Sequence, residues 1–444
     1  MSVVILVLAG LITPIFYRKN IQVAKGIAVI AFGIAFYFVF RGDGIGEYLP
    51  GFSLTPDIQL IEYALLITLA AVSLSLTGFE RPLIAQMLFL SAVSLALLET
   101  TNLFIYIVLF EAVAIISYIL VANIRNFYNA EGAIKAFIAG AVASGIILFG
   151  LALFSFVSPS FDYNSITVTG KFTLIAVAIM LAGIFYKLTI VPMHGWAADA
   201  YAQINHVAAA ILSGVIKVVV LVATFNAFKR FLEAYPTMAI ILFGFFAVLT
   251  MTLANFMALW QKRISKVLAY SSIAHSGYAL IPFAAVGSKY AYAGVLYYAI
   301  AYLFMQTAVF LVLNELRVKG GIKYIKDLRG LGYRHPLLAL FFTIQIFSLA
   351  GIPLLAGFMS KAVAFYAGVD AGLWWLVLIA LLNSALAVAY YVVLLKNIYL
   401  DEPVTKQPLQ VSYGVLLGQL ILAAGTFYFG IVAADIFNVT MPLH

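Results

Sequence analysis

The chain has 444 residues, of which 65% are hydrophobic and only 9% are charged, and its formal net charge is +8. A soluble protein of this length could not cover its surface with so few charged groups, so the composition excludes a soluble globular protein. The chain contains no cysteine, which excludes disulfide bonds and cysteine-ligated iron–sulfur clusters within it.

Hydrophobic runs of about 20 residues recur along the whole length, and each can cross a bilayer as an α-helix. Because backbone polar groups in lipid must bond to one another, we predict an all-α integral membrane fold of about fourteen transmembrane helices. The predicted spans are 2–16, 21–40, 59–77, 83–99, 103–122, 134–157, 172–205 (broken), 207–226, 238–258, 266–286, 290–314, 337–368 (broken), 373–399 and 411–433. The first run lacks a basic leader and a small-residue cleavage site, so it is predicted to be a retained helix.

Four ionisable residues fall deep inside the predicted helices. In chain order they are Glu111, Lys187, Lys217 and Lys361. Each intramembrane charge costs about 2.5–3.5 kcal/mol on insertion scales, so four are hard to explain as accidents of packing. Static ion pairs that fix helix packing are the alternative, but one acid cannot neutralise three lysines. A desolvated lysine can lose its proton near neutral pH, so each is a candidate proton-transfer site.

Two predicted spans are interrupted, and each interruption lies beside one of these lysines. Proline removes a backbone donor, glycine tolerates unusual dihedral angles, and irregular backbone at membrane depth occurs only where it is buried in protein or lines a water cavity. An ordinary proline kink is the alternative for either break alone. The residues that mark the breaks are Pro192 after Lys187, and Gly351, Pro353 and Gly357 before Lys361.

The two breaks are five helices apart, which suggests an internal duplication. Because five is odd, the two copies would be inverted in the membrane, as in many transporters. The predicted organisation is three N-terminal helices in 1–82, a first five-helix repeat in 83–226 (helices 4–8), an inverted second repeat in 238–399 (helices 9–13) and a C-terminal helix in 411–433.

Three further residues lie nearer the predicted cytoplasmic ends and are candidates for a relay or an access route. Lys135 opens one helix in EGAIKAFIAG, and Lys266 opens another in RISKVLAYSSIAHSGY, in which His275 lies deeper. The alternative for the two lysines is that their side chains extend to the interface. The alternative for His275 is a hydrogen-bonded structural histidine.

The loop charges predict the orientation. Seventeen lysines and arginines lie in the loops after odd-numbered helices, whereas the loops after even-numbered helices hold only Arg41, Lys171, Lys229, Arg230 and Lys289. By the positive-inside rule the odd loops face the cytoplasm, so both termini would lie on the outer face of the inner (plasma) membrane. The basic balance therefore reflects membrane topology, and no nucleic-acid partner is expected.

Six motifs resemble, in order, those of the antiporter-like subunits of respiratory complex I. They are LFEAVAIISY, EGAIKAFIAGAVASGIILFG, FYKLTIVPMHGWAADAYAQ, RISKVLAYSSIAHSGY, GIPLLAGFMSK and YYVVLLKNIYLDEP. The span 290–314 contains neither histidine nor lysine, which resembles the N-type subunits of NADH:quinone oxidoreductase. The first three helices match no motif of the family. Carried over by position, the family's buried glutamate and lysines fall on Glu111, Lys187, Lys217 and Lys361.

The resemblance implies a proton-translocating membrane subunit, driven by electron transfer in other subunits. Its expected partners are the lipid bilayer, the other membrane subunits of a complex I-like assembly, and protons. No cofactor or metal is expected in this chain, and quinone, flavin and iron–sulfur centres are expected in the partner subunits. The alternatives are a subunit of a cation/proton antiporter, a subunit of a related membrane-bound hydrogenase or dehydrogenase complex, and a scaffold whose buried charges are static.

The orientation can be tested with a reporter protein fused after His444. A reporter that works only outside the cytoplasm should be active there, because the loop charges put the C-terminus on the outer face. The same fusion with a reporter that works only in the cytoplasm should be inactive. Activity of the cytoplasmic reporter would overturn the predicted orientation or the predicted number of helices.

Overall fold

The computed structural model describes residues 1–17, 20–42, 45–76, 82–122, 127–403 and 407–432, without the side chains of 17, 127–130 and 132. Several predictions concern residues outside these ranges. They are the position of the C-terminus, the last residues of the predicted spans 59–77 and 411–433, and the loop residues Arg18, Lys19, Arg81, Arg125 and Lys406.

The N-terminal part consists of five helices and one hairpin. The helices are α1 (Ser2–Tyr17), α2 (Ile21–Arg41), α3 (Pro56–Ser75), α4 (Leu83–Glu99) and α5 (Leu103–Ala122). The strands β1 (Gly46–Leu49) and β2 (Phe52–Leu54) pair antiparallel between α2 and α3. Gly51 adopts a φ of 83° in the turn between the strands, a conformation that favours glycine. The hairpin was not predicted from the hydrophobic pattern.

The middle of the chain contains the first broken helix. Its elements are α6 (Phe127–Ser155), α7 (Lys171–Lys187), α8 (Gly195–Gln203), α9 (His206–Ala210), the π-helix η2 (Ile211–Ile216) and α10 (Lys217–Ala234). The predicted span 172–205 is thus two helices, α7 and α8, as its proline indicated. The span 207–226 was predicted as a regular helix, and the structure instead has a π-helical segment within it.

The last part contains the second broken helix. Its elements are α11 (Pro236–Leu259), α12 (Ile264–Ala279), α13 (Ile281–Ala284), α14 (Ala291–Gly320), the 3-10 helix η3 (Ile325–Leu328), α15 (Leu331–Arg334), α16 (Pro336–Ala350), α17 (Ala356–Asp370), α18 (Trp374–Tyr399) and α19 (Tyr413–Ile431). Proline occupies the first helical position of α3, α11 and α16, where its missing N–H has no intrahelical partner to lose.

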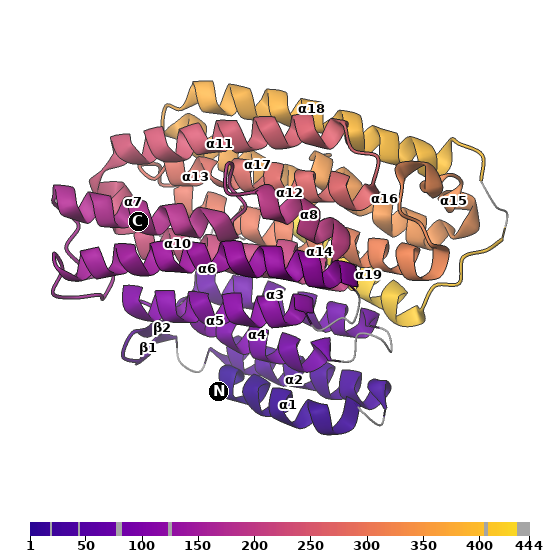
Figure 1. Cartoon of the computed structure of the whole chain (residues 1–444), viewed down its shortest axis with the longest axis horizontal. Helices are drawn as coiled ribbons and strands as arrows, with labels where there is room; N and C mark the ends of the chain where they lie inside the picture. Colours follow the sequence, from indigo (N-terminus) through magenta and orange to yellow (C-terminus); the bar gives the residue numbers. More distant parts are fainter. Residues whose placement is uncertain (18–19, 43–44, 77–81, 123–126, 404–406, 433–444) are drawn as a thin grey trace.

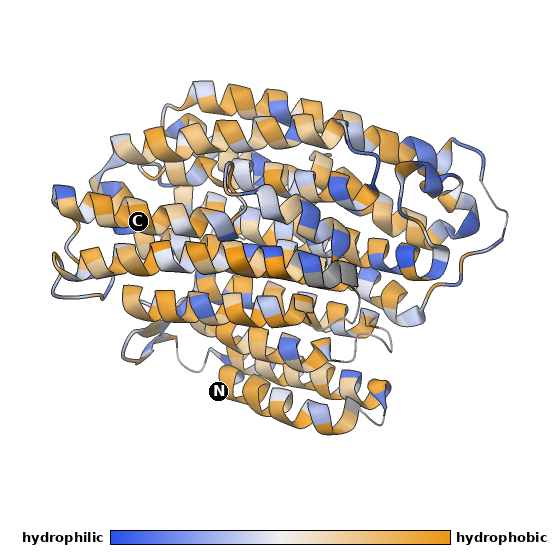
Figure 2. Cartoon of the chain, viewed as in Figure 1, coloured by the Kyte–Doolittle hydropathy of each residue, from blue (hydrophilic) through white to orange (hydrophobic). Residues whose placement is uncertain are grey.

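The all-α membrane class is confirmed, with the small hairpin as an addition. Within the described residues, nine helices are long and apolar enough to cross a membrane. The apolar parts of α1, α4 and α16 are shorter, with 10–17 residues each. Figure 2 shows hydrophobic residues along the lengths of the helices and hydrophilic residues gathered at one end, around α15. The count of fourteen crossings remains a prediction, because the spans 172–205, 266–286 and 337–368 are each divided between two helices. The division of 266–286 between α12 and α13 was not predicted.

Helix α14 forms the centre of the bundle. Every residue from Ala293 to Leu316 is buried, and α14 packs against α3, α9, α10, α16, α17 and α19. In Figure 1, α14 lies between the N-terminal helices and the layer that contains α11 and α18. A helix that is apolar on all sides is stable only when it is surrounded, and here the surroundings are protein.

Both helix breaks contain a non-glycine residue with a positive φ. Thr189, after α7, has a φ of 58°, and Leu354, between α16 and α17, has a φ of 72°. Gly351, at the end of α16, has a φ of 91°. Positive φ at a residue with a side chain costs about 1–3 kcal/mol, so the surrounding packing must hold these segments in place.

The contact between α6 and α7 depends on close approach at Gly183. A Cβ atom there would lie 2.7 Å from the carbonyl oxygen of Ala143 and 2.5 Å from Ile147. We therefore expect Gly183→Ala to lower the free energy of unfolding by about 1–3 kcal/mol through overpacking. Thermal unfolding of the purified protein in detergent measures the effect.

The matched control is Gly145→Ala on α6, where a Cβ would meet no atom within 4 Å. It should be neutral or stabilising by up to about 1 kcal/mol, because alanine favours helix more than glycine does. Equal stability of the two variants would contradict the proposed packing constraint.

Candidate functional site

Glu111 belongs to α5, and Lys187 bonds to the same helix without contacting Glu111. Lys187 is the last residue of α7, is 7% exposed, and donates from Nζ to the hydroxyl of Ser117 on α5 at 2.9 Å. Glu111 is half-buried on α5 and accepts from Ser144 of α6 at 2.6 Å. The two charges lie near enough to interact through space. A change in the charge of Glu111 would therefore change the electrostatic energy of a charged Lys187 without a direct bond.

Lys217 is the first residue of α10 and is 4% exposed. Its Nζ donates to the hydroxyl of Thr189 at 2.9 Å, and to the hydroxyl and the carbonyl of Ser272 at 2.8 and 3.0 Å. An ammonium group has three donors, and all three are satisfied here by neutral oxygens. Thr189 is the residue with positive φ, so the first helix break supplies an oxygen to Lys217.

Lys361 is 5% exposed on α17 and is held by the second helix break. Its Nζ donates to the carbonyls of Leu349 and Ala350 at 3.0 and 3.1 Å, and to Ser384 at 2.9 Å. Those two carbonyls lack intrahelical partners because α16 ends at Ala350. The C-terminal end of a helix also carries partial negative charge, which stabilises a cation.

The buried residues Glu111, Lys187, Lys217 and Lys361 are called the buried line below. His275 lies between Lys217 and the second helix break. It is 2% exposed on α12, and its Nδ1 is 2.6 Å from the hydroxyl of Tyr298. Its ring also bonds the carbonyl of Leu349, which therefore serves both His275 and Lys361. Imidazole can donate through one ring nitrogen and accept through the other, as a relay requires.

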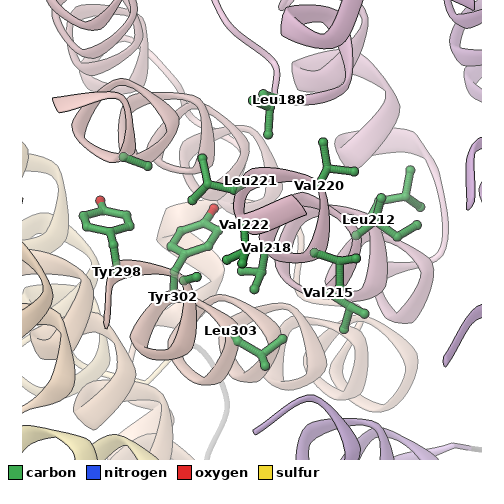
Figure 3. Packing of buried hydrophobic residues seen from close by; sticks show 14 of the residues in the cluster. Leu188, Leu212, Val215, Val218, Val220, Leu221, Val222, Tyr298, Tyr302 and Leu303 are labelled. Atoms are coloured by element: carbon green, nitrogen blue, oxygen red, sulfur yellow. The ribbon is translucent and has the colours of Figure 1, made fainter. Parts of the chain in front are cut away.

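A very small cavity separates Lys217 from His275. Its volume is about 10 Å³, and Tyr298 and Tyr302 line it together with these two residues. A single water needs about 10–15 Å³, so the space is at the lower limit for one molecule. Figure 3 shows the apolar side chains, including Val218 and Leu221, that pack around Tyr298 and Tyr302. The polar line is therefore narrow and nearly dry at this point.

The structure does not bring every candidate to this buried line. Lys135 is exposed and forms an ion pair with Glu131 at 2.6 Å. Lys266 pairs with Asp199 at 3.0 Å, and its side chain is 30% exposed. Lys266 lies in the first turn of α12 and Lys135 in the third turn of α6, and the exposure of both fits the alternative that they extend toward the interface.

The predicted break residues lie at or beside the two interruptions. Pro192 lies between α7 and α8, whereas Gly351 and Pro353 lie between α16 and α17. Gly357 is in the first turn of α17, where a Cβ would lie 1.8 Å from the carbonyl oxygen of Ser348. Gly357 thus permits a close approach to α16.

The neutral side chains that bond to these charged groups were not predicted from the sequence. They are Ser117, Ser144, Thr189, Ser272, Tyr298, Tyr302 and Ser384. Isolated hydroxyls in apolar runs are common in membrane helices, where they usually bond the preceding turn. The one available signal was their position near an intramembrane charge.

None of the three buried lysines forms an ion pair with a described acidic residue. Each ammonium donates to hydroxyl or carbonyl oxygens. Lys187 and Lys361 also lie 4.9 and 5.3 Å from the ring centres of Tyr118 and Tyr278. Static ion pairs therefore do not account for these charges in the part of the chain that is described. The described part of the chain contains no group of three or more His, Cys, Asp or Glu side chains that could hold a metal ion.

Comparison with known proteins identifies the family of the chain. A family profile described as NADH:quinone oxidoreductase/Mrp antiporter, TM, matches residues 100–387. The chain belongs to this family, as a multi-pass, antiporter-like membrane subunit.

Among its members the chain is similar to the N subunits. It is 35% identical to the F(420)H(2) dehydrogenase subunit N of Methanosarcina mazei over 69% of this chain, and covers 65% of that relative's length. It is 30% identical to the NADH-quinone oxidoreductase subunit N of Rhodospirillum rubrum, covering 88% of this chain and 80% of the relative. A chain of respiratory complex I from Thermus thermophilus with bound aureothin has a TM-score of 0.81 and 25% identity, covering 97% of this chain and 98% of that one.

Ser272 offers a direct test of this geometry. Ser272→Ala removes the hydroxyl that accepts from both Lys217 and Tyr302. We expect at least a several-fold loss of proton transport, because a buried ammonium group that loses an acceptor is destabilised by about 1–3 kcal/mol. Proton uptake into vesicles that contain the assembled protein measures this loss.

Ser272→Thr keeps the hydroxyl and should restore most of the transport. If Ser272→Ala transports protons as fast as the unmodified protein, the hydrogen bonds to Lys217 have no role in transport.

Proposed function

We propose that this chain translocates protons across the membrane as the N-type, antiporter-like subunit of a complex I-type redox-driven pump. The proposal rests on three buried lysines, each held by neutral groups and two of them bound to helix breaks. Such sites can gain and lose a proton without breaking an ion pair, because their acceptors are hydroxyls and carbonyls.

The first step would be the control of Lys187 by Glu111. A nearby carboxylate favours the charged form of a buried lysine, whereas apolar surroundings favour its neutral form. When Glu111 is screened or moves away, desolvation dominates and Lys187 releases its proton. A tenfold change in proton affinity requires about 1.4 kcal/mol, so a modest movement is sufficient.

The proton would then pass to Lys217 through the first helix break. Thr189 lies two residues after Lys187 and accepts from Lys217, so one short segment contacts both sites. The strained backbone at Thr189 is held by its surroundings, and a shift there would change both lysines together.

Transfer beyond Lys217 would depend on water entering the narrow region before His275. The cavity of about 10 Å³ must expand slightly to hold a hydrogen-bonded water securely. Tyr298, Tyr302 and His275 offer the polar partners that such a water needs. Lys361 is then the terminal site, and both it and His275 donate to the carbonyl of Leu349, which holds the two groups close together.

The two broken helices also support the proposal of inverted repeats. Helices 4–8 (83–226) and helices 9–13 (238–399) each contain one break beside a functional lysine. In transporters, such interrupted segments face each other at the binding site near the bilayer midplane. Both termini on the outer face, predicted from the loop charges, are part of the same topology.

The redox chemistry would reside in partner subunits. The relatives named above are subunits of an F(420)H(2) dehydrogenase and of NADH-quinone oxidoreductases, and we infer a membrane assembly of that type for this chain. Quinone, flavin and iron–sulfur centres would belong to those partners.

A cation/proton antiporter subunit is the second candidate, because the family includes Mrp antiporters. The buried part of α14 lacks histidine and lysine, which favours the N type.

Two substitutions test the relay. Glu111→Gln should lower the number of protons moved per electron, because Lys187 loses the charge that lets it hold its proton. Lys361→Ala should lower it by removing the terminal site, with at least a several-fold loss of pumping in each case. Both are measured as proton uptake coupled to electron transfer in vesicles that contain the assembled complex.

The control is Lys229→Ala, which removes an exposed lysine paired with Glu233 and should leave pumping unchanged. Normal assembly together with unmodified pumping in both Glu111→Gln and Lys361→Ala would contradict the relay. The subunits that co-purify with the tagged chain distinguish the two candidates, since redox subunits would be absent from a simple antiporter.

A further inference from the structure

A second group of buried ionisable residues lies in the N-terminal helices, outside the residues that match the family profile. Glu62 lies in the second turn of α3 and is fully buried, whereas Glu99 is the last residue of α4 and is 5% exposed. Both lie toward the end of the bundle that the loop charges assign to the outer face. Neither belongs to the line from Glu111 to Lys361.

The two carboxyl groups are direct neighbours, and Glu62 has no other described partner. Glu62 and Glu99 contact each other through their side chains. Neither carboxylate oxygen of Glu62 has a hydrogen-bond donor among the described residues. The ionisable groups around the pair are the hydroxyls of Tyr48 and Tyr63 and the amino group of Met1, which lies near Glu99. Among the described residues, no lysine or arginine side chain is paired with Glu62.

Two carboxylates cannot bond to each other, because both accept and neither donates. Like charges in a shared buried site also cannot both ionise. A proton between the two groups solves both problems, because the protonated carboxyl donates to the ionised one. The contact between Glu62 and Glu99 is therefore that of an acid and its conjugate base.

The hairpin completes this site and provides contact with water. The Tyr48 hydroxyl, on β1, donates to Glu99. Burial, and then the adjacent Glu99, raises the pKa of Tyr48 well above its ordinary value, so the hydroxyl remains a donor. Tyr48 and Glu99 line a cavity of about 290 Å³ with Phe38, Phe52 and Leu54. Several waters fit in this volume, so the proton can exchange with solvent through Glu99.

We propose that Glu62 and Glu99 form a proton-binding site that holds one shared proton, with Tyr48 as the hydrogen-bond donor to the pair. Its ligand is a proton that comes from solvent through the cavity beneath the hairpin. The site is separate from the lysine line and does not depend on the function proposed above.

Infrared spectroscopy of the assembled complex tests this proposal, because a protonated carboxyl group has its own C=O absorption. At pH 7 we expect Glu62→Gln and Glu99→Gln each to remove the whole absorption of one protonated carboxyl. The glutamine amide in each variant donates to the remaining carboxylate, which then ionises without a shared proton. Tyr48→Phe should shift the absorption without removing it, because the donor to the pair is lost.

Glu47→Gln is the matched control, because Glu47 is exposed on the same hairpin, and it should leave the absorption unchanged. Equal spectra for the unmodified protein and both variants would overturn the proposal. So would two independent acids, for which each variant removes only half of a signal of two carboxyls. An absorption that disappears when sodium is added at constant pH would instead identify a cation site and also overturn it.

Labelling of Glu62 or Glu99 by a hydrophobic carbodiimide, which reacts with protonated carboxyls, gives a second measurement that does not require a variant to fold.

Discussion

The structure depends on the cost of placing an ammonium group in an apolar interior. An unpaired buried charge is strongly unfavourable, so each lysine must find oxygens inside the bundle. Regular helices offer few, because their carbonyls are already bonded along the backbone. The interruptions after α7 and after α16 change this, since they bring the Thr189 hydroxyl to Lys217 and two free carbonyls to Lys361. The breaks and the lysines are therefore parts of one solution.

The same constraint explains the residues that lie beside the breaks. Ser272 satisfies two of the three donors of Lys217 and accepts from Tyr302 as well. The π-helix η2 ends immediately before Lys217 and packs against α14. Its Gly214 allows close approach, since a Cβ there would lie 2.4 Å from the hydroxyl of Thr307. Wide helical turns of this kind often occur at functional positions.

Much of the fold could be predicted from the sequence because the bilayer limits the choices. Long apolar runs must be helices, and Pro192 and Pro353 interrupt them where helices end in the structure. The ends were less accurate, and α14 continues to Gly320 beyond its predicted limit at residue 314. The hairpin and η2 were missed, because a short strand pair and one wide turn leave no periodic pattern.

The site was predictable in its charges but not in its partners. Glu111 and the three buried lysines stand out because they are rare at membrane depth. Thr189 and Ser272 do not stand out, because a hydroxyl in an apolar run carries no sign of what it will meet. The Lys266–Asp199 contact joins two segments far apart in the sequence, and only the folded chain shows it.

The central position of α14 has a consequence for biosynthesis. Helices enter the bilayer roughly in the order in which they are synthesised, and α14 precedes three of its neighbours, α16, α17 and α19. When α14 first inserts, part of its surface must therefore contact lipid or an insertion factor. Its apolar residues make that temporary exposure tolerable, since lipid tails are as apolar as leucine. The bundle is closed around α14 only when α19, the last described helix, arrives between α3 and α16.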